Sequence, residues 1–164
     1  VMADASLTPE AKAIYAYLAS FAGAGESSFP TRDKILSDLN LGKDRYYSHF
    51  KLLIQEGYIS VQKMKGYLNR NCYLLVSNPK KLQAAGLPGG SKAGKLVSSG
   101  IRSKGYGLIY KAVMQDKRLS ATAKAIFAYL SSYAGAGTVS FPSRTVFSKN
   151  WESANPPITS TSAN

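Results

Sequence analysis

The side chains of this sequence that are best suited to a chemical task are cations and hydroxyl groups at helical spacing. Five of them lie close together in the chain: Lys43, Arg45, Tyr47, Ser48 and Lys51. In a helix of residues 43–56 they face outward when Tyr46, Phe50 and Leu53 face the core. Arginine pairs with guanine, serine bonds to several base edges, and lysine suits phosphate. The pattern predicts a helix that reads a DNA major groove, with a plain solvated face as the alternative.

Two helices joined by a tight turn would position this outward face. Pro30 closes the preceding segment, and Thr31 can cap a helix that continues to about residue 39. Asn40 and Gly42 suit a tight turn, and Gly57 is placed to end the second helix. The apolar positions of the two helices are Ile35, Leu36, Leu39, Tyr46, Phe50, Leu53 and Ile54.

A small β wing is expected after the second helix. Residues 58–62 and 72–76 have the composition of strands, and residues 27–29 are expected to pair with them. The candidate phosphate contacts of the wing are Lys63, Lys65 and Arg70, and Arg32 at the start of the first of the two helices is a further candidate. The fold class is therefore mainly α with a small β wing, a winged helix-turn-helix formed by residues 1–76.

One stretch also resembles a known family. Residues 7–59 read LTPEAKAIYAYLASFAGAGESSFPTRDKILSDLNLGKDRYYSHFKLLIQEGYI. The string resembles winged-helix domains of replication initiators, of the replisome-organiser and initiator-A type, from plasmids, phages and conjugative elements of Gram-positive bacteria. The resemblance extends to about residue 76 and implies sequence-specific duplex binding in replication initiation. A transcriptional regulator on the same fold is one alternative, and a truncated interaction module or decoy with weak DNA binding is another.

Charge is unevenly distributed along the 164 residues, whose net charge is +12. Residues 77–112 contain seven Lys or Arg and no acid, and residues 77–103 are rich in Gly, Ser and Lys. That composition predicts a flexible basic linker, acting either as a tether along phosphate or as a plain spacer. The overall balance favours a polyanionic partner, with nucleic acid first and an anionic membrane second. The expected partner is double-stranded DNA, and the family resemblance adds self-association and replisome proteins as further partners.

An internal repeat relates each position n to position n+112. Residues 113–144 match residues 1–32 without a gap, and 20 of the 32 positions are identical. Residues 104–148 are therefore interpreted as a partial second winged-helix copy. Its helix is expected from about residue 121 to residue 133, either packed on the first copy, packed on another chain, or frayed.

Residues 149–164 are expected to form an irregular tail, since Pro156 and Pro157 oppose a helix. A reading-frame slip after Arg144 is one interpretation of this tail, and a tail with its own role is the other. The glycine-containing segment at residues 103–112 has no counterpart before Val1. A chain that begins inside its first module is one interpretation of this difference, and the sequence leaves it open.

Enzymatic and metal-binding constellations are absent from the sequence, so we expect no enzyme, no cofactor and no metal. His49 is interpreted as a packing residue, and Cys72 has no second ligand nearby. Asp33, Asp38 and Asp44 are interpreted as solvated or capping. The single cysteine fits a reducing cytoplasm, and without a run of about 18 apolar residues no membrane span is expected.

Overall fold

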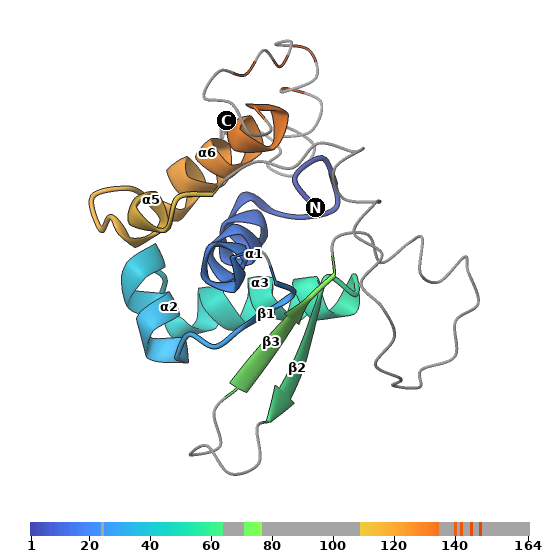
Figure 1. Cartoon of the computed structure of the whole chain (residues 1–164), viewed down its shortest axis with the longest axis vertical. Helices are drawn as coiled ribbons and strands as arrows, with labels where there is room; N and C mark the ends of the chain where they lie inside the picture. Colours follow the sequence, from blue (N-terminus) through green and yellow to red (C-terminus); the bar gives the residue numbers. More distant parts are fainter. Residues whose placement is uncertain are drawn as a thin grey trace, which may run out of the picture.

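The computed structural model describes residues 1–23, 25–63, 71–76 and 109–134, with residues 140, 142, 145 and 148. Its elements are α1 (Pro9–Ala22), β1 (Ser27–Ser28), α2 (Arg32–Leu39), α3 (Lys43–Gln55), β2 (Ile59–Lys63), β3 (Asn71–Leu75), α5 (Lys111–Gln115) and α6 (Ala121–Ala134). Figure 1 shows α1 in the middle of the molecule, with α6 on one side of it and α3 on the other. In the same view, strands β2 and β3 extend below α3 (Figure 1).

The predicted pair of helices and its turn are confirmed. The Thr31 hydroxyl accepts from the backbone N–H of Lys34 at 3.3 Å and caps α2. Asn40 ends α2 in the left-handed conformation, at φ 51°, which asparagine tolerates better than most residues. Gly42 then takes an ordinary extended conformation, at φ −68°, and begins α3. Asn40 alone therefore makes the left-handed bend of the turn.

The predicted wing strands are also confirmed. They form a three-stranded antiparallel sheet in the order β1-β3-β2, in which Ser28 pairs with Tyr73 and Val61 pairs with Tyr73 from the other side. Gly57, at φ 73°, turns the chain from α3 into β2, a backbone conformation that favours glycine. The tip of the wing, residues 64–70, lies outside the described residues.

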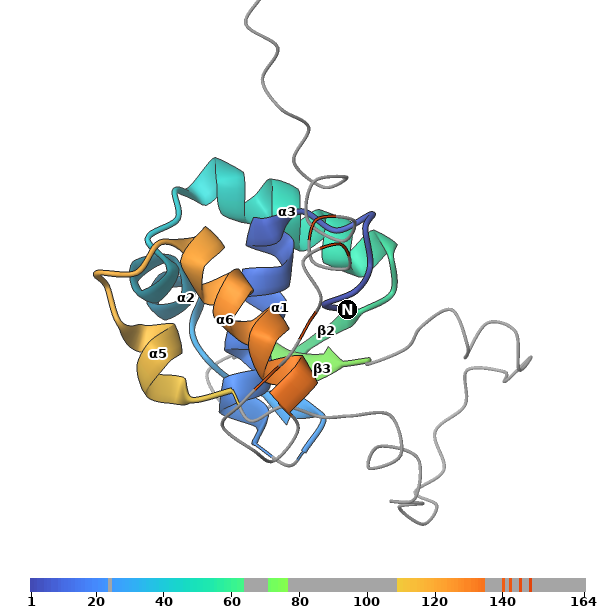
Figure 2. The same ribbon diagram turned by 90° about the horizontal axis from the view of Figure 1, so that it is seen from above.

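Helix α1 is buried on two opposite sides, which the sequence pattern did not predict. Apolar residues recur along α1 at helical spacing and form one stripe: Ala11, Ile14, Tyr15, Leu18 and Phe21. Ala11, Ile14 and Leu18 are fully buried, but Tyr15 and Phe21 are only partly buried. The opposite side is also fully buried, through Lys12, Ala13, Ala16 and Tyr17. In both views α6 lies beside α1 (Figures 1 and 2), and Tyr17 of α1 and Lys124 of α6 both donate to Asp38.

Helix α6 spans residues 121–134, so it begins where predicted and ends one residue after the predicted residue 133. It packs on α1, the first of the three outcomes considered for it. The short helix α5 was not expected, and the Lys111 ammonium lies 4.4 Å from the centroid of the Phe21 ring on α1. The segment interpreted as a linker, residues 77–103, and the tail, residues 149–164, lie outside the described residues, so both interpretations stay predictions.

A buried polar cluster joins α1, α2 and α6, and it corrects the interpretation of Asp38. This residue is only 5% exposed, whereas a solvated or capping carboxylate was expected. The Tyr17 hydroxyl donates to its carboxylate at 2.7 Å, the Lys34 ammonium lies 3.0 Å from it, and the Lys124 ammonium donates to its backbone carbonyl. Burial by itself would raise the pKa of Asp38, but the Tyr17 and Lys34 hydrogen bonds outweigh it and lower that pKa.

Candidate nucleic-acid interface

Helix α3 presents a continuous polar face to solvent. All five of its candidate contact residues are exposed: Lys43, Arg45, Tyr47, Ser48 and Lys51. Tyr46, Phe50 and Leu53 are buried on the other face, while Ile54, expected to be apolar core, is 45% exposed. Ile54 follows Leu53 by one residue, which is about 100° around a helix, so only one of the two can point directly at the core.

Aromatic contacts hold α3 against the wing. The Tyr46 and Phe50 rings stack with their centroids 5.1 Å apart, and Phe50 meets the Tyr73 ring of β3 edge-on at 5.8 Å. Such pairs stabilise their arrangement beyond simple area burial. The rings of Tyr46, Phe50 and Tyr73 thus fix the polar face of α3 relative to the strands of the wing.

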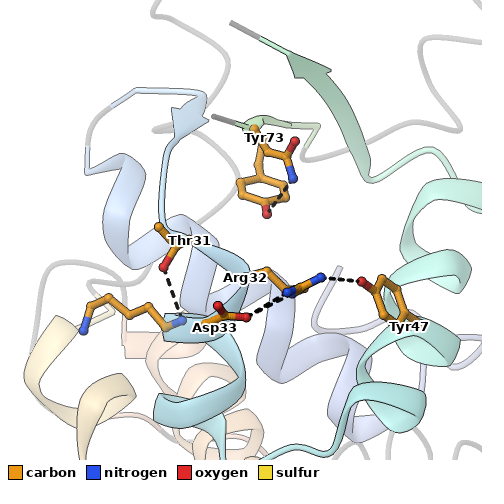
Figure 3. Close-up of polar contacts among 7 residues, drawn as sticks. Thr31, Arg32, Asp33, Tyr47 and Tyr73 are labelled. Atoms are coloured by element: carbon orange, nitrogen blue, oxygen red, sulfur yellow. Dashed lines mark hydrogen bonds and ion pairs between the residues drawn. The ribbon is translucent and has the colours of Figure 1, made fainter. Parts of the chain in front are cut away.

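Arg32 extends the polar face from α2 to α3. Its guanidinium donates to the Tyr47 hydroxyl at 3.1 Å and to the Asp33 carboxylate at 3.1 Å. Figure 3 shows Arg32 lying between these two side chains. The contact joins two candidate residues that are separated by 15 positions in the chain. Sequence reasoning had named both residues but had not placed them together.

Beside this contact the surface is hollowed. A pocket of about 260 Å³ lies between the start of α2, α3 and β3, and its lining residues are Arg32, Asp33, Tyr46, Tyr47, Phe50, Asn71 and Tyr73. Its charged and amide groups come from α2 and β3, and its aromatic rings come from α3 and β3. Lys63 is exposed at the end of β2. The other two wing candidates, Lys65 and Arg70, lie outside the described residues.

Arg45 is engaged by a partner that sequence reasoning missed. Its guanidinium donates to the carboxylate of Glu10 on α1 at 2.6 Å, although the Arg45 side chain is still 64% exposed. Glu10 stands 35 positions away, in the first turn of α1, and no sequence pattern connected the two. Ser48 is also engaged, because its hydroxyl donates to the backbone carbonyl of Asp44 at 3.0 Å. A ligand that uses either residue must replace these contacts.

Helices α1, α2 and α3, the tight turn and the three-stranded antiparallel sheet have the arrangement of a winged helix-turn-helix. Residues 5–59 match a family described as a helix-turn-helix domain, and the match contains all of α1, α2 and α3. No curated protein and no solved structure shows significant similarity to the chain. The helix-turn-helix match indicates DNA binding, in which the second helix of the motif contacts the major groove.

Among the described residues, no group of three or more His, Cys, Asp or Glu is arranged to hold a metal ion. Within those residues there is also no helix with the length and apolar character needed to cross a membrane. Cys72 is a free thiol buried in β3.

The Glu10–Arg45 ion pair gives a first prediction. Glu10→Gln is expected to tighten duplex binding by about 0.5–1 kcal/mol, because the freed guanidinium no longer has to leave a carboxylate and one negative charge is removed near phosphate. Fluorescence anisotropy with a labelled duplex measures the change. Glu26→Gln is the matched control, since it removes the same charge from an exposed residue outside α1–α3. Equal gains in both variants would mean that the ion pair does not restrain Arg45.

His49 gives a second prediction, on pH dependence. Its Nδ1 lies 2.9 Å from the Thr8 hydroxyl, which also accepts from the backbone N–H of Ala11 and caps α1. Burial lowers the pKa of His49, and the charge of Arg45 lowers it further against the opposing effect of Glu10. The folded state therefore favours the neutral ring, and an unfolded chain takes up the proton first as the pH falls.

The resulting stability is present above about pH 6.5, the pKa of an unperturbed histidine, and is lost as the pH falls through the lower folded value. Thermal melting between about pH 7 and about pH 5 should show this loss in the wild type. His49→Gln should show a smaller loss over the same interval, because a neutral amide does not titrate. Identical pH profiles for the wild type and His49→Gln would show that the titration of His49 is not the source of the stability loss.

Proposed function

We propose that the chain binds duplex DNA in a sequence-specific manner and acts in replication initiation of a plasmid or other mobile element. The observation that carries DNA binding is the exposed cationic face of α3, which stands on a helix-turn-helix domain beside a wing. The role in replication is supported by the resemblance of residues 7–76 to initiator domains. The role in replication is more specific than DNA binding and is tested separately.

In the proposed complex, α3 lies in the major groove. Residues near its N-terminus reach base edges, so Arg45 pairs with a guanine and Ser48 bonds to a neighbouring base. Lys43 and Lys51 flank these residues and bind phosphates. Arg45 leaves Glu10 and Ser48 leaves the Asp44 carbonyl as the base contacts form, so the protein exchanges internal hydrogen bonds for external ones.

Arg32 and Tyr47 act together at the edge of the groove. The Tyr47 oxygen accepts from Arg32, so its own hydrogen is left to donate to a phosphate oxygen. The guanidinium adds positive charge at the same point. The wing cations Lys63, Lys65 and Arg70 bind phosphates of the flanking backbone. These contacts set position and affinity, while the α3 contacts set sequence.

A transcriptional regulator on the same fold is the second candidate. The winged helix-turn-helix itself favours it equally, because both kinds of protein use this module. The location of the binding sites separates the two. An initiator is expected to bind iterated sites beside its own origin, whereas a regulator is expected to bind promoters.

The test is selection of bound duplexes from a random pool with the full chain, followed by mapping of the selected sequence onto the replicon that encodes the protein. Clustered repeats at an origin are the expected result. Single sites at promoters would favour the regulator. Failure to enrich any sequence, with only weak binding, would favour the decoy and overturn the proposal. Arg45→Ala is the control, because it should lose enrichment at the guanine position.

A further inference from the structure

Every residue that α6 buries has a buried counterpart in α1, 112 positions earlier in the sequence repeat. Each of four buried positions on α1 has a buried counterpart 112 residues later: Lys12 and Lys124, Ala13 and Ala125, Ala16 and Ala128, Tyr17 and Tyr129. All four residue types are identical between the two helices. We call Lys12, Ala13, Ala16 and Tyr17 the alanine face of α1, after its two central residues.

This set occupies one side of each helix. With 100° between successive residues, positions 12, 13, 16 and 17 cluster on one side, and positions 11, 14 and 18 lie opposite. In α1 the opposite side packs into the winged-helix core. In α6 the counterparts of that opposite side include Ile126 and Leu130, which are only partly buried. The burial of α6 is therefore concentrated on its counterpart of the alanine face, and α1 is the helix it packs on.

Two helices that pair through the same residues have the character of an isologous contact. In such a contact one patch is self-complementary, so each partner supplies the same surface. Small residues at the centre allow the two helix backbones to approach closely, and α1 and α6 both supply two alanines there. We propose that the alanine face of α1 is a self-association surface for a second copy of this chain, and that α6 occupies it within the monomer.

The contact at Asp38 supports a second copy as the occupant. The Lys124 ammonium on α6 donates to the Asp38 carbonyl near the end of α2, where helix carbonyls lack a partner within the helix. In a pair of α1 helices, Lys12 of each protomer takes the position of Lys124 and faces Asp38 of the other. A symmetric dimer makes this contact twice, while the described residues of one chain contain it once. The two α2 helices supply both acceptors.

The monomer is favoured by default, because α6 is tethered to the same chain and its effective concentration is high. Release of α6 exposes the alanine face and allows two domains to pair. Paired helix-turn-helix domains bind two half-sites related by a twofold axis, so the exchange would change the DNA site that the protein prefers. The inference concerns the oligomeric state alone and does not depend on the proposed role in replication.

The experiment compares two full-length double variants at positions related by the repeat. A125R/A128R places two guanidinium groups on α6, and A13R/A16R places them on α1. Both variants expel α6 from α1, but only A125R/A128R leaves the alanine face of α1 intact. In sedimentation equilibrium we expect A125R/A128R to move from 17.6 kDa towards twice this mass as its concentration rises, and A13R/A16R to remain at 17.6 kDa.

Amide exchange over residues 121–134 reports whether α6 has been released. If A125R/A128R has an unprotected α6 and stays monomeric, the proposal is overturned. If α6 of this variant remains protected from exchange, the proposal is also overturned, because α6 then packs on α1 through residues other than Ala125 and Ala128. Dimers of both variants would show that association does not use the alanine face. The single variants A16R and A128R repeat the comparison with half of the added charge if a double variant fails to fold.

Discussion

Asp38→Ala is expected to lower the free energy of unfolding by about 3 kcal/mol. The substitution removes the acceptor of the buried Tyr17 hydroxyl, and a buried polar group left without a partner costs about 1–3 kcal/mol. It also removes the partner of the Lys34 ammonium, which lies 3.0 Å from the carboxylate. Urea unfolding followed by circular dichroism measures the loss.

Asp33→Ala is the control for Asp38→Ala. Asp33 lies on the same helix with its side chain 80% exposed, so its loss should cost less than about 1 kcal/mol. Because the folded-state pKa of Asp38 is lowered, its contribution is present above the ordinary carboxyl value of 3.8 and fades as the pH falls through the folded value. The variant should therefore lose less stability in acid than the wild type. Equal costs for the two substitutions would show that the buried cluster is not a source of stability.

Arg45→Ala is expected to weaken binding to the selected duplex by about 1–3 kcal/mol and to relax the preference at one base pair. The reason is the loss of a bidentate guanine contact, which alanine cannot replace. Anisotropy titrations with the selected duplex and with single-base variants of it measure both effects. The relaxed preference is the distinguishing result, since loss of a phosphate contact would not alter the ranking of sequences.

Lys51→Ala is the matched comparison on the same helix. Its loss should weaken binding to all duplexes alike and reduce the dependence of affinity on salt, because one phosphate contact disappears. If the two substitutions gave the same pattern, Arg45 would be a phosphate contact rather than a base contact. If neither had an effect, the recognition-helix assignment would be wrong.

The helix-turn-helix and the wing were predictable because their signals are local. Thr31 caps a helix, Asn40 takes a left-handed conformation, and Gly57 allows the turn into β2, each within a few residues of the element it limits. The aromatic residues of α3 alternate with its cations at helical spacing, so the exposed and buried faces could be assigned from the sequence. The confirmed turn and strands rest on these signals.

Features that depend on distant partners were not predictable. Lys12 looks like a surface lysine in the pattern of α1, yet it is fully buried on a helix that packs against α6, which lies more than 100 residues later in the chain. Asp38 is buried for a related reason, through Tyr17 and Lys124. The Glu10–Arg45 pair spans 35 positions. The repeat did offer one signal for the burial of Lys12. Lys12 and its alanine neighbours are identical in the second copy, at Lys124, Ala125 and Ala128, whereas residues on a solvated side of a helix are free to differ.

The most direct test of the central claim, that α3 and the wing bind duplex DNA, is an amide NMR titration of the full chain with the selected duplex. We expect the largest chemical-shift changes on residues 43–51 of α3, on Arg32 and on β2 near Lys63, with little change on α6. Changes centred on α5 and α6, or no saturable change at low salt, would contradict it.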